Sequence, residues 1–276
     1  VTGGLRYDDH NVYGHQLSRR LGLVSSPWSS LHAKLLHGTA FKAPSPLLLY
    51  AIPSATGDVV GNAELKPQFV NTFELQIEHA PSPRQLASTA LVYNLLTDKT
   101  EFIQESGNKT ARNVARAATI SWESQIELEY PRWLHTHLSL ELQRTTQRSQ
   151  QDDYVGEVLA ASGSIYPEVM IHAGLAVQPP HAPLRGSVLA SYIGSRRASG
   201  NNALLHGGPY RLPRYVLLDA TLSTTGVRIL RGAPQEMSFQ LIGKNLLGVT
   251  GPAPGFSGVD YPLSPRALLL QINVSL

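Results

Sequence analysis

Thr119–Gln143 read TISWESQIELEYPRWLHTHLSLELQ, and this stretch decides the fold class. Up to Tyr130 the even-numbered positions are mostly apolar, whereas the odd-numbered positions carry serine, glutamine and glutamate. The alternation resumes after Pro131-Arg132-Trp133, with leucines opposite histidine, serine and glutamate. A period of two is typical of β-strands with two unlike faces. We therefore predict a long antiparallel hairpin whose turn lies at Pro131.

The same alternation recurs along the chain, and helical periodicity is nearly absent. It predicts about twelve strands, over 1–9, 17–26, 30–39, 68–79, 86–98, 114–130, 133–146, 167–178, 184–194, 213–225, 235–245 and 265–276. Short connections are expected near Pro27, Pro81–Pro83, Pro131, Pro179–Pro180 and 232–234. Long connections are expected over 10–16, 40–67, 144–166, 195–212 and 246–264, with a hairpin tip at 106–109 on the same side. Short turns at one end and long loops at the other are typical of an outer-membrane barrel.

The composition favours the same class. Charged residues make up 16% of the 276 residues, where about a quarter is usual for soluble domains. No apolar run approaches the ~18 residues of a transmembrane helix. The sequence has no cysteine, which excludes disulfides, thiolate zinc sites and thiol catalysis. The net charge of +3 comes from scattered arginines and lysines, so we expect no nucleic-acid partner.

Alternation alone does not separate a membrane barrel from a soluble β-sandwich, so that binding module stays open as an alternative. Strand length favours the barrel, because sandwich strands usually run about 5–6 residues and these run to a dozen or more. Aromatic spacing favours it too. Trp122 and Tyr130 share a face and would lie roughly 20 Å apart across the membrane, near the apolar band flanked by aromatic girdles. Trp28, Tyr130 and Trp133 all lie at short turns, where one girdle belongs.

A series of motifs in order along the chain resembles the C-terminal half of TonB-dependent outer-membrane receptors. The matching segments are GLRYD (Gly4–Asp8), LSRRLGL (Leu17–Leu23), GTAFKAPS (Gly38–Ser45), NAELKPQ (Asn62–Gln68), FELQIE (Phe73–Glu78), PRYVLLD (Pro213–Asp219), KNLL (Lys244–Leu247) and SPR (Ser264–Arg266). The sequence departs from the family pattern in three places. Arg19 replaces the usual proline, Ile120-Ser121-Trp122-Glu123 replaces the usual GVE strand start, and the final residue is Leu276 rather than an aromatic.

The resemblance implies an all-β fold, an antiparallel transmembrane β-barrel. Residues 1–276 would supply its last twelve of twenty-two strands. The plug domain and the first ten strands would lie outside this sequence, so both sheet edges here would be unpaired. It also implies energy-coupled uptake of a scarce nutrient across the bacterial outer membrane, foremost a ferric siderophore, with cobalamin or a sugar as other ligands. The partners would be outer-membrane lipid and a TonB-type coupling protein acting through the plug.

Alternative functions remain open from the sequence. A passive porin-like channel or a non-functional barrel fragment would share the same strand pattern. An enzyme has no positive support, and we expect no catalytic residues and no cofactor. Glu123, Glu127, Glu129 and Glu141 are interpreted as polar residues of a water-filled wall, not as acid–base pairs.

Candidate ligand-binding residues lie in the long connection over 195–212. Arg196, Arg197 and Tyr210 offer groups that suit the carboxylate or catecholate oxygens of an anionic ferric chelate. We predict them as the ligand contacts. His135 and His137 share a face two residues apart, but no third ligand is evident, so we predict no metal site.

Overall fold

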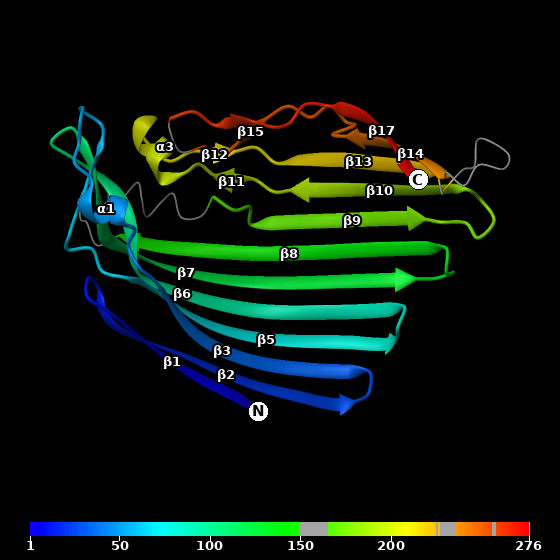
Figure 1. Cartoon of the computed structure of the whole chain (residues 1–276), viewed down its shortest axis with the longest axis horizontal. Helices are drawn as coiled ribbons and strands as arrows, with labels where there is room; N and C mark the ends of the chain where they lie inside the picture. The colour runs from blue at the N-terminus through cyan, green and yellow to red at the C-terminus, as the bar shows by residue number, and fades with distance from the viewer. Residues whose placement is uncertain (150–164, 225, 227–235, 256–257, 276) are drawn as a thin grey trace.

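The computed structural model describes residues 1–149, 165–224, 226, 236–255 and 258–275. The expected short turn at 232–234, most of the connection over 144–166 and the final Leu276 lie outside these residues. Within the described residues, twelve strands form one antiparallel sheet (Figure 1). They are β1 (Thr2–His10), β2 (Gly14–Trp28), β3 (Leu31–Lys42), β5 (Gln68–Ser82), β6 (Gln85–Glu105), β7 (Asn108–Glu129), β8 (Leu134–Ser149), β9 (Val169–Val177), β10 (Leu184–Ile193), β13 (Tyr215–Thr224), β14 (Glu236–Lys244) and β17 (Ala267–Ser275).

The remaining elements are short and lie in the long connections at one end of the sheet (Figure 1). They are α1 (Pro46–Tyr50), β4 (Val59–Val60), β11 (Arg196–Arg197), α3 (Gly200–Leu205), β12 (Arg211–Leu212), β15 (Pro252–Ala253) and β16 (Tyr261–Pro262). Neither described helix has the length and apolar character needed to cross a membrane. The all-β fold class and the twelve strands predicted from the sequence are confirmed.

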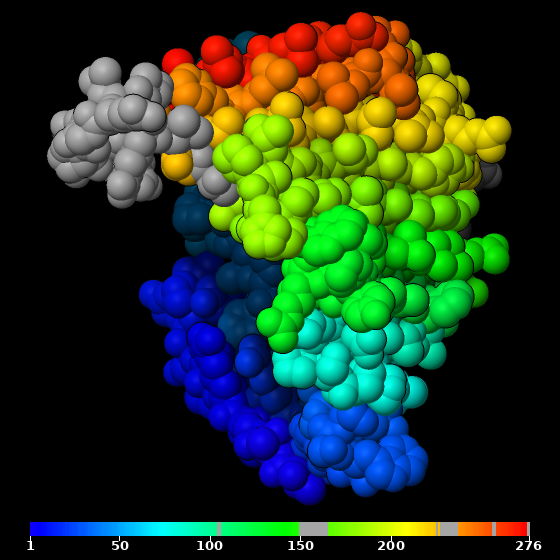
Figure 2. Space-filling view, turned by 90° about the vertical axis from the view of Figure 1, so that its right-hand side faces the viewer, coloured from blue at the N-terminus to red at the C-terminus, as the bar shows by residue number. Residues whose placement is uncertain are grey.

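The sheet is a single curved layer, which Figure 2 shows running from the blue N-terminal strands round to the red C-terminal strands. Each strand pairs with its neighbours in sequence, from β1 at one edge to β17 at the other. These two edge strands do not pair with each other, so the barrel is not closed in this chain. The predicted hairpin at Pro131 is present, with Ile120 opposite Arg144 and Glu129 opposite His135.

The two faces of the sheet differ as the sequence predicts. On the outward face Ile120, Trp122 and Leu270 are 48%, 46% and 67% exposed, so no second layer formed by the described residues covers them. A sandwich would bury these side chains. The aromatic residues at the short-turn end, Trp28 and Tyr130, are also exposed. The outward face is therefore apolar and uncovered, which suits contact with lipid.

Two proline positions differ from the prediction. We expected strands to end before Pro27 and Pro81, but β2 and β5 continue past them. Each proline lies where the pairing register shifts, between Ser25 and Trp28 and between His79 and Ser82 respectively. A β-bulge leaves a residue out of the hydrogen-bond ladder, so a proline without an N–H is tolerated there.

Two connections at the other end are also tighter than expected. The connection predicted as a long loop over 10–16 is only three residues, and Gly14, with φ of 73°, allows the sharp reversal. Strands β6 and β7 extend to a two-residue tip at Ser106-Gly107, where φ is 50° and 84°. Positive φ at both positions is typical of a type I′ hairpin turn. These strands are therefore much longer than the predicted 86–98 and 114–130.

Candidate functional site

The inward face of the sheet is a polar wall. Its titratable side chains on the central strands are Glu74 and Glu78 on β5, Glu123, Glu127 and Glu129 on β7, Glu141, His135 and His137 on β8, and His172 on β9. Nδ1 of His137 lies 3.6 Å from Oε1 of Glu127 on the neighbouring strand, and both are solvent-accessible. No group of three or more such ligands in the described part of the chain could hold a metal ion.

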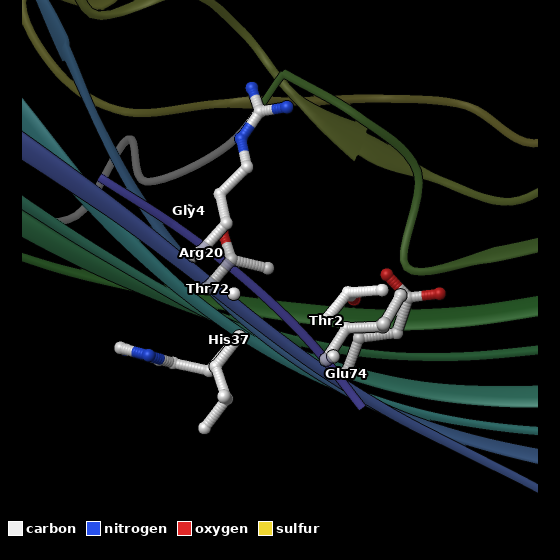
Figure 3. Close-up of a pocket in the computed structure, with 11 residues that line it drawn as sticks. Thr2, Gly4, Arg20, His37, Thr72 and Glu74 are labelled. Carbon is white, nitrogen blue, oxygen red and sulfur yellow. The ribbon is translucent and has the colours of Figure 1, made fainter. Parts of the chain in front are cut away.

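A hollow of about 480 Å³ interrupts this wall near the free edge of β1 (Figure 3). Glycines at 4, 22 and 38 occupy inward positions on β1, β2 and β3, which leaves the backbone uncovered. A Cβ on Gly22 would lie 2.7 Å from Oγ1 of Thr2, so a side chain there would crowd the hollow. Figure 3 shows Arg20 and Glu74 on the inward side and His37 directed to the opposite side.

The connection between β3 and β5 is held against the β6–β7 hairpin. Strand β4 pairs in parallel with Lys109 and Thr110 of β7, and the N–H of Gly57 donates to Oδ1 of Asn108 at 3.0 Å. Asn62 Nδ2 donates to the carbonyl of Ala111 at 3.0 Å. A small apolar cluster supports these bonds and consists of Leu48, Leu49, Leu65 and Ala111. The connection between β3 and β5 is therefore fixed against the hairpin by hydrogen bonds and apolar contacts.

Asn113 makes the second attachment of the same connection. Its Oδ1 accepts from the N–H of Lys66 at 2.8 Å, and its Nδ2 donates to the carbonyls of Lys66 and Asp98 at 3.0 and 2.7 Å. Asp98 has φ of 53° and lies in the bulge where β6 shifts register against β7. One amide side chain thus joins the loop, the bulge and the strand.

Two further loops, which follow β10 and β14, are held together by a buried polar network. Asn202 in α3 is fully buried, donates to Oδ1 of Asp260 at 3.1 Å and accepts from the N–H of Gly258 at 2.8 Å. The hydroxyl of Ser199, the N-cap of α3, donates to the carbonyl of Gly255 at 2.5 Å. Because buried polar groups are costly when unpaired, this network fixes the relative positions of the two loops.

The predicted ligand residues lie at this network. Arg196 and Arg197 form β11, and the N–H of Ala198 donates to the carbonyl of Tyr210 at 3.0 Å, so the structure brings all three together. Arg196 is only 4% exposed, and its Nη2 donates to the carbonyl of Pro252 at 2.9 Å. The guanidinium also lies 4.9 Å from the ring centroid of Tyr215. Its Nε and Nη1 are buried and have no hydrogen-bond partner among the described residues.

Tyr210 joins the same network through its phenol. Its hydroxyl donates to Oδ2 of Asp260 at 2.8 Å. Burial, together with this hydrogen bond to Asp260, raises the pKa of Tyr210 above its usual value. The phenol therefore stays protonated, and able to donate, above the pH at which an exposed tyrosine ionises.

A small hollow beside the β11–β12 ladder gathers three arginines. It is lined by Gln143, Thr145, Tyr166, Glu168, Arg196, Arg197 and Arg211. Nη2 of Arg211 lies 3.6 Å from Oε2 of Glu168, and both side chains are about half exposed. The guanidinium charge in this hollow thus exceeds the carboxylate charge among its lining residues, which favours an anion.

Sequence reasoning missed the residues that order these loops, above all Asn202, Asp260 and Asn113. One local signal was available, because Ser199 precedes a short run of helix-compatible residues and caps it through Asn202 N–H. The contacts between loops that are more than fifty residues apart, such as Asn202 with Asp260, have no local sequence signature.

A family model described as "TonB dependent receptor-like, beta-barrel" matches residues 1–246. A ferric enterobactin receptor from Pseudomonas aeruginosa, solved with enterobactin, is 18% identical, with a TM-score of 0.73 over 98% of this chain and 42% of that one. The ferric-catecholate import receptor Fiu of E. coli K12 is 19% identical, with a TM-score of 0.70 over 94% of this chain and 35% of that one.

A third neighbour is the FrpB iron transporter of Neisseria meningitidis. It is 14% identical, with a TM-score of 0.72 over 98% of this chain and 42% of that one. No curated protein sequence matched the chain. At these identities the likeness is one of fold, and the chain spans less than half the length of each of these three solved proteins.

Proposed function

Because the chain belongs to the TonB dependent receptor-like β-barrel family, we propose that residues 1–276 form the C-terminal part of an outer-membrane receptor barrel for energy-coupled nutrient uptake. The observation that carries this proposal is the single curved sheet with an apolar, uncovered outward face and a polar inward wall. Such a layer suits a boundary between lipid and a wet interior. The family consists of receptors and transporters, and we propose no catalytic activity.

The ligand that we propose is an anionic iron chelate of the siderophore class. Two observations support it. The neighbours named above are described as ferric enterobactin, ferric-catecholate and iron receptors or transporters. The hollow beside β11 and β12 gathers Arg196, Arg197 and Arg211, and guanidinium groups suit the oxygens of carboxylates and catecholates.

We propose different roles for the three predicted residues. Arg196 and Tyr210 are hydrogen-bonded within the loops, to Pro252 and Asp260 respectively, so both hold the shape of the site, and the Arg196 guanidinium also adds positive charge to it. Arg197 lines the hollow together with Arg196 and Arg211, and its guanidinium would meet the ligand's oxygens. Energy coupling would need a TonB-type partner acting on a plug domain of the complete protein.

The test is uptake of a radiolabelled ferric catecholate by cells that make the complete protein. We expect cells with an intact outer membrane to accumulate the ferric catecholate and to stop accumulating it when the proton gradient is dissipated. We also expect R197Q to bind the ligand more weakly. Loss of one charge-assisted contact worth about 1.5–3 kcal/mol lowers affinity by roughly tenfold or more.

The matched control is R132Q, which removes the same charge from the turn between β7 and β8 at the opposite end. If R197Q and the starting protein bind the ligand equally well, Arg197 does not contact the ligand. Uptake that persists without a proton gradient would instead favour a passive channel.

A further inference from the structure

The outward face of the sheet carries very few charged side chains. Leaving aside the β6–β7 hairpin beyond residue 97, the pairing registers place no outward-facing lysine or glutamate on the described strands. The outward-facing charges on those strands are Asp9 on β1, Arg19 on β2, Arg116 on β7, and Arg144 and Arg148 on β8. Three of these four arginines therefore gather on two adjacent strands.

The three arginines begin where the apolar band ends. Along β8 the outward side chains run Leu138, Leu140 and Leu142, and then change to Arg144, Thr146 and Arg148. Arg144 lies eleven residues beyond Trp133, roughly 28 Å along the membrane normal for a rise of about 3.3 Å and a tilt of about 40°. The apolar band of such barrels is about 25 Å tall. Arg144 thus falls at the level of lipid headgroups on the long-loop side.

The arrangement of the charges is unfavourable without an anion. Arg116 and Arg148 are directly opposite each other on neighbouring strands, and Arg144 shares their face. Like charges directly opposite in a sheet repel. Asp98 lies in the bulge of β6 across from Arg116, but the described residues show no ion pair between them. All three arginines are exposed, so an external anion has access to the cluster.

We propose that Arg116, Arg144 and Arg148 bind the phosphate groups of a lipid headgroup in the leaflet on the long-loop side. The inference rests on the proposed function for the position of the chain in a membrane. Charge complementarity selects the occupant, because guanidinium forks match phosphate oxygens and the cluster adjoins acyl-chain-facing leucines. A phosphorylated lipid would meet both surfaces at once.

The experiment compares three forms of the complete protein in detergent, with bound lipid counted by native mass spectrometry. They are the starting protein, the triple variant R116Q/R144Q/R148Q and the control R84Q/R132Q/R185Q. The control removes the same three charges at the short-turn end. Each is titrated with diphosphorylated lipid A, with the same lipid after dephosphorylation, and with inorganic phosphate.

We expect the triple variant to bind diphosphorylated lipid A at least tenfold more weakly than the starting protein and the control. Dephosphorylated lipid should bind all three proteins equally and weakly, and inorganic phosphate should not compete at millimolar concentration. Equal binding of the phosphorylated lipid by triple variant and control would overturn the proposal, as would full binding of the dephosphorylated lipid.

A second variant guards against a folding defect in the triple variant. R116E places a carboxylate opposite Arg148, so it should weaken lipid binding while raising the melting temperature measured without lipid. Unchanged lipid binding by folded R116E also overturns the proposal. If the proposed function is wrong, the complete protein will be absent from the outer-membrane fraction. If only the lipid site is wrong, the protein will be in that fraction, and its lipid binding will not depend on the three arginines.

Discussion

Amide and carboxylate side chains at single positions order the long-loop end of the sheet. Asn245, at the end of β14, has φ of 47°, a conformation that asparagine tolerates better than most residues. Its Nδ2 donates to the carbonyls of Val249 and Ser264 at 2.8 and 2.9 Å, and its N–H donates to Oδ1 of Asp219 at 2.8 Å. Two segments recognised separately in the sequence, PRYVLLD and KNLL, are thus joined through Asp219 and Asn245.

Asp58 gives the β3–β5 connection a pH dependence. Hydrogen bonds from the backbone N–H groups of Ser54 and Ala55, and from the Ser54 hydroxyl, lower the pKa of its carboxyl below the usual value. The lowered pKa means that the loop is stabilised above the ordinary aspartate pKa of about 3.9 and loses this stabilisation as the pH falls through the lower folded value. We expect hydrogen exchange of residues 54–58, corrected for intrinsic rates, to accelerate below about pH 4.

The variant D58A removes the three hydrogen bonds and should exchange rapidly at every pH. Its exchange in residues 54–58 at pH 7 should match that of the starting protein at low pH. If D58A and the starting protein keep the same protection at pH 7, the carboxylate does not hold this turn.

Gly61 is the residue of this connection that tolerates change least. A Cβ there would lie 2.6 Å from the N of Ala51 and 2.7 Å from the O of Leu49, both rigid backbone atoms. We expect G61A to destabilise the loop by about 1–3 kcal/mol, as overpacking does elsewhere, and to speed proteolytic cleavage within residues 46–67. The matched variant G4A meets no atom within 4 Å and should be cleaved at the starting rate.

At the scale of elements, the strands were predictable and their contacts at the loops were not. The period-two pattern predicted β5, β7, β8 and β17 because apolar and polar residues alternate within the sequence of each strand. The pattern failed at bulges and turns, where a proline inside β2 or a positive φ at Gly14 depends on what the neighbouring strand does. The hairpin tip predicted over 106–109 is present, but the predicted strand bounds stopped short of it because beyond Leu96 neither strand keeps a clear alternation.

Of the candidate site, the sequence located the loop and its arginines but not their geometry. Arg196, Arg197 and Tyr210 were chosen for their chemistry and are indeed adjacent. The burial of Arg196 depends on Pro252, 56 residues further along the chain. No periodicity within the loop encodes that distance. Whether these side chains meet a ligand stays a prediction.

Three polar side chains on the outward face of β6 and β7 are paired with one another. Nε1 of Trp122 donates to Oγ1 of Thr89 at 2.7 Å, and the same hydroxyl lies 2.8 Å from Oγ of Ser124. In hydrocarbon an unpaired polar group costs several kcal/mol. Strands β6 and β7 thus carry these polar groups on an apolar outward face without leaving them unsatisfied.

The two faces of β8 give a direct test of the membrane position. Leu138 faces outward near mid-height, and its neighbour Ser139 faces inward. We expect L138R to lower the free energy of unfolding in a bilayer by about 2–4 kcal/mol, the cost of an arginine at the midplane of a barrel's lipid face. S139R places the same side chain in the wet interior and should cost much less.

The measurement is urea unfolding of the complete protein in vesicles, followed by tryptophan fluorescence. If both variants unfold at the same urea concentration, the outward face does not contact lipid and the inward–outward assignment is wrong.

At the scale of the whole molecule, the open edges of β1 and β17 decide whether the chain is sufficient by itself. Each edge leaves roughly five N–H and five C=O groups without a strand partner, and hydrocarbon does not satisfy them. We therefore expect residues 1–276 produced alone to form no protease-resistant species in vesicles, whereas the complete protein does. The readout is the fraction of each that survives trypsin and migrates faster unheated than heated on a gel.

Residues 1–276 produced alone could instead close into a narrower barrel by pairing β1 with β17. Pairs of introduced cysteines test for this closure. The double variants L5C/L270C and L5C/I272C place thiols on the outward faces of the two edge strands. We expect no intramolecular disulfide in the isolated chain under oxidising conditions. Efficient cross-linking in residues 1–276 would show that β1 and β17 find each other and that the chain needs no further strands.

The β6–β7 hairpin has a practical consequence for locating the protein on living cells. Its two-residue tip at Ser106-Gly107 lies thirteen residues beyond Ile120, the outermost isoleucine of the apolar band on β7, and Figure 1 shows it projecting past the rest of the sheet. At about 3.3 Å per residue and a tilt of about 40°, that is roughly 30 Å above the acyl chains. A short peptide epitope inserted between these two residues would lie well outside the bilayer, so binding of an antibody to intact cells would report the orientation of the hairpin.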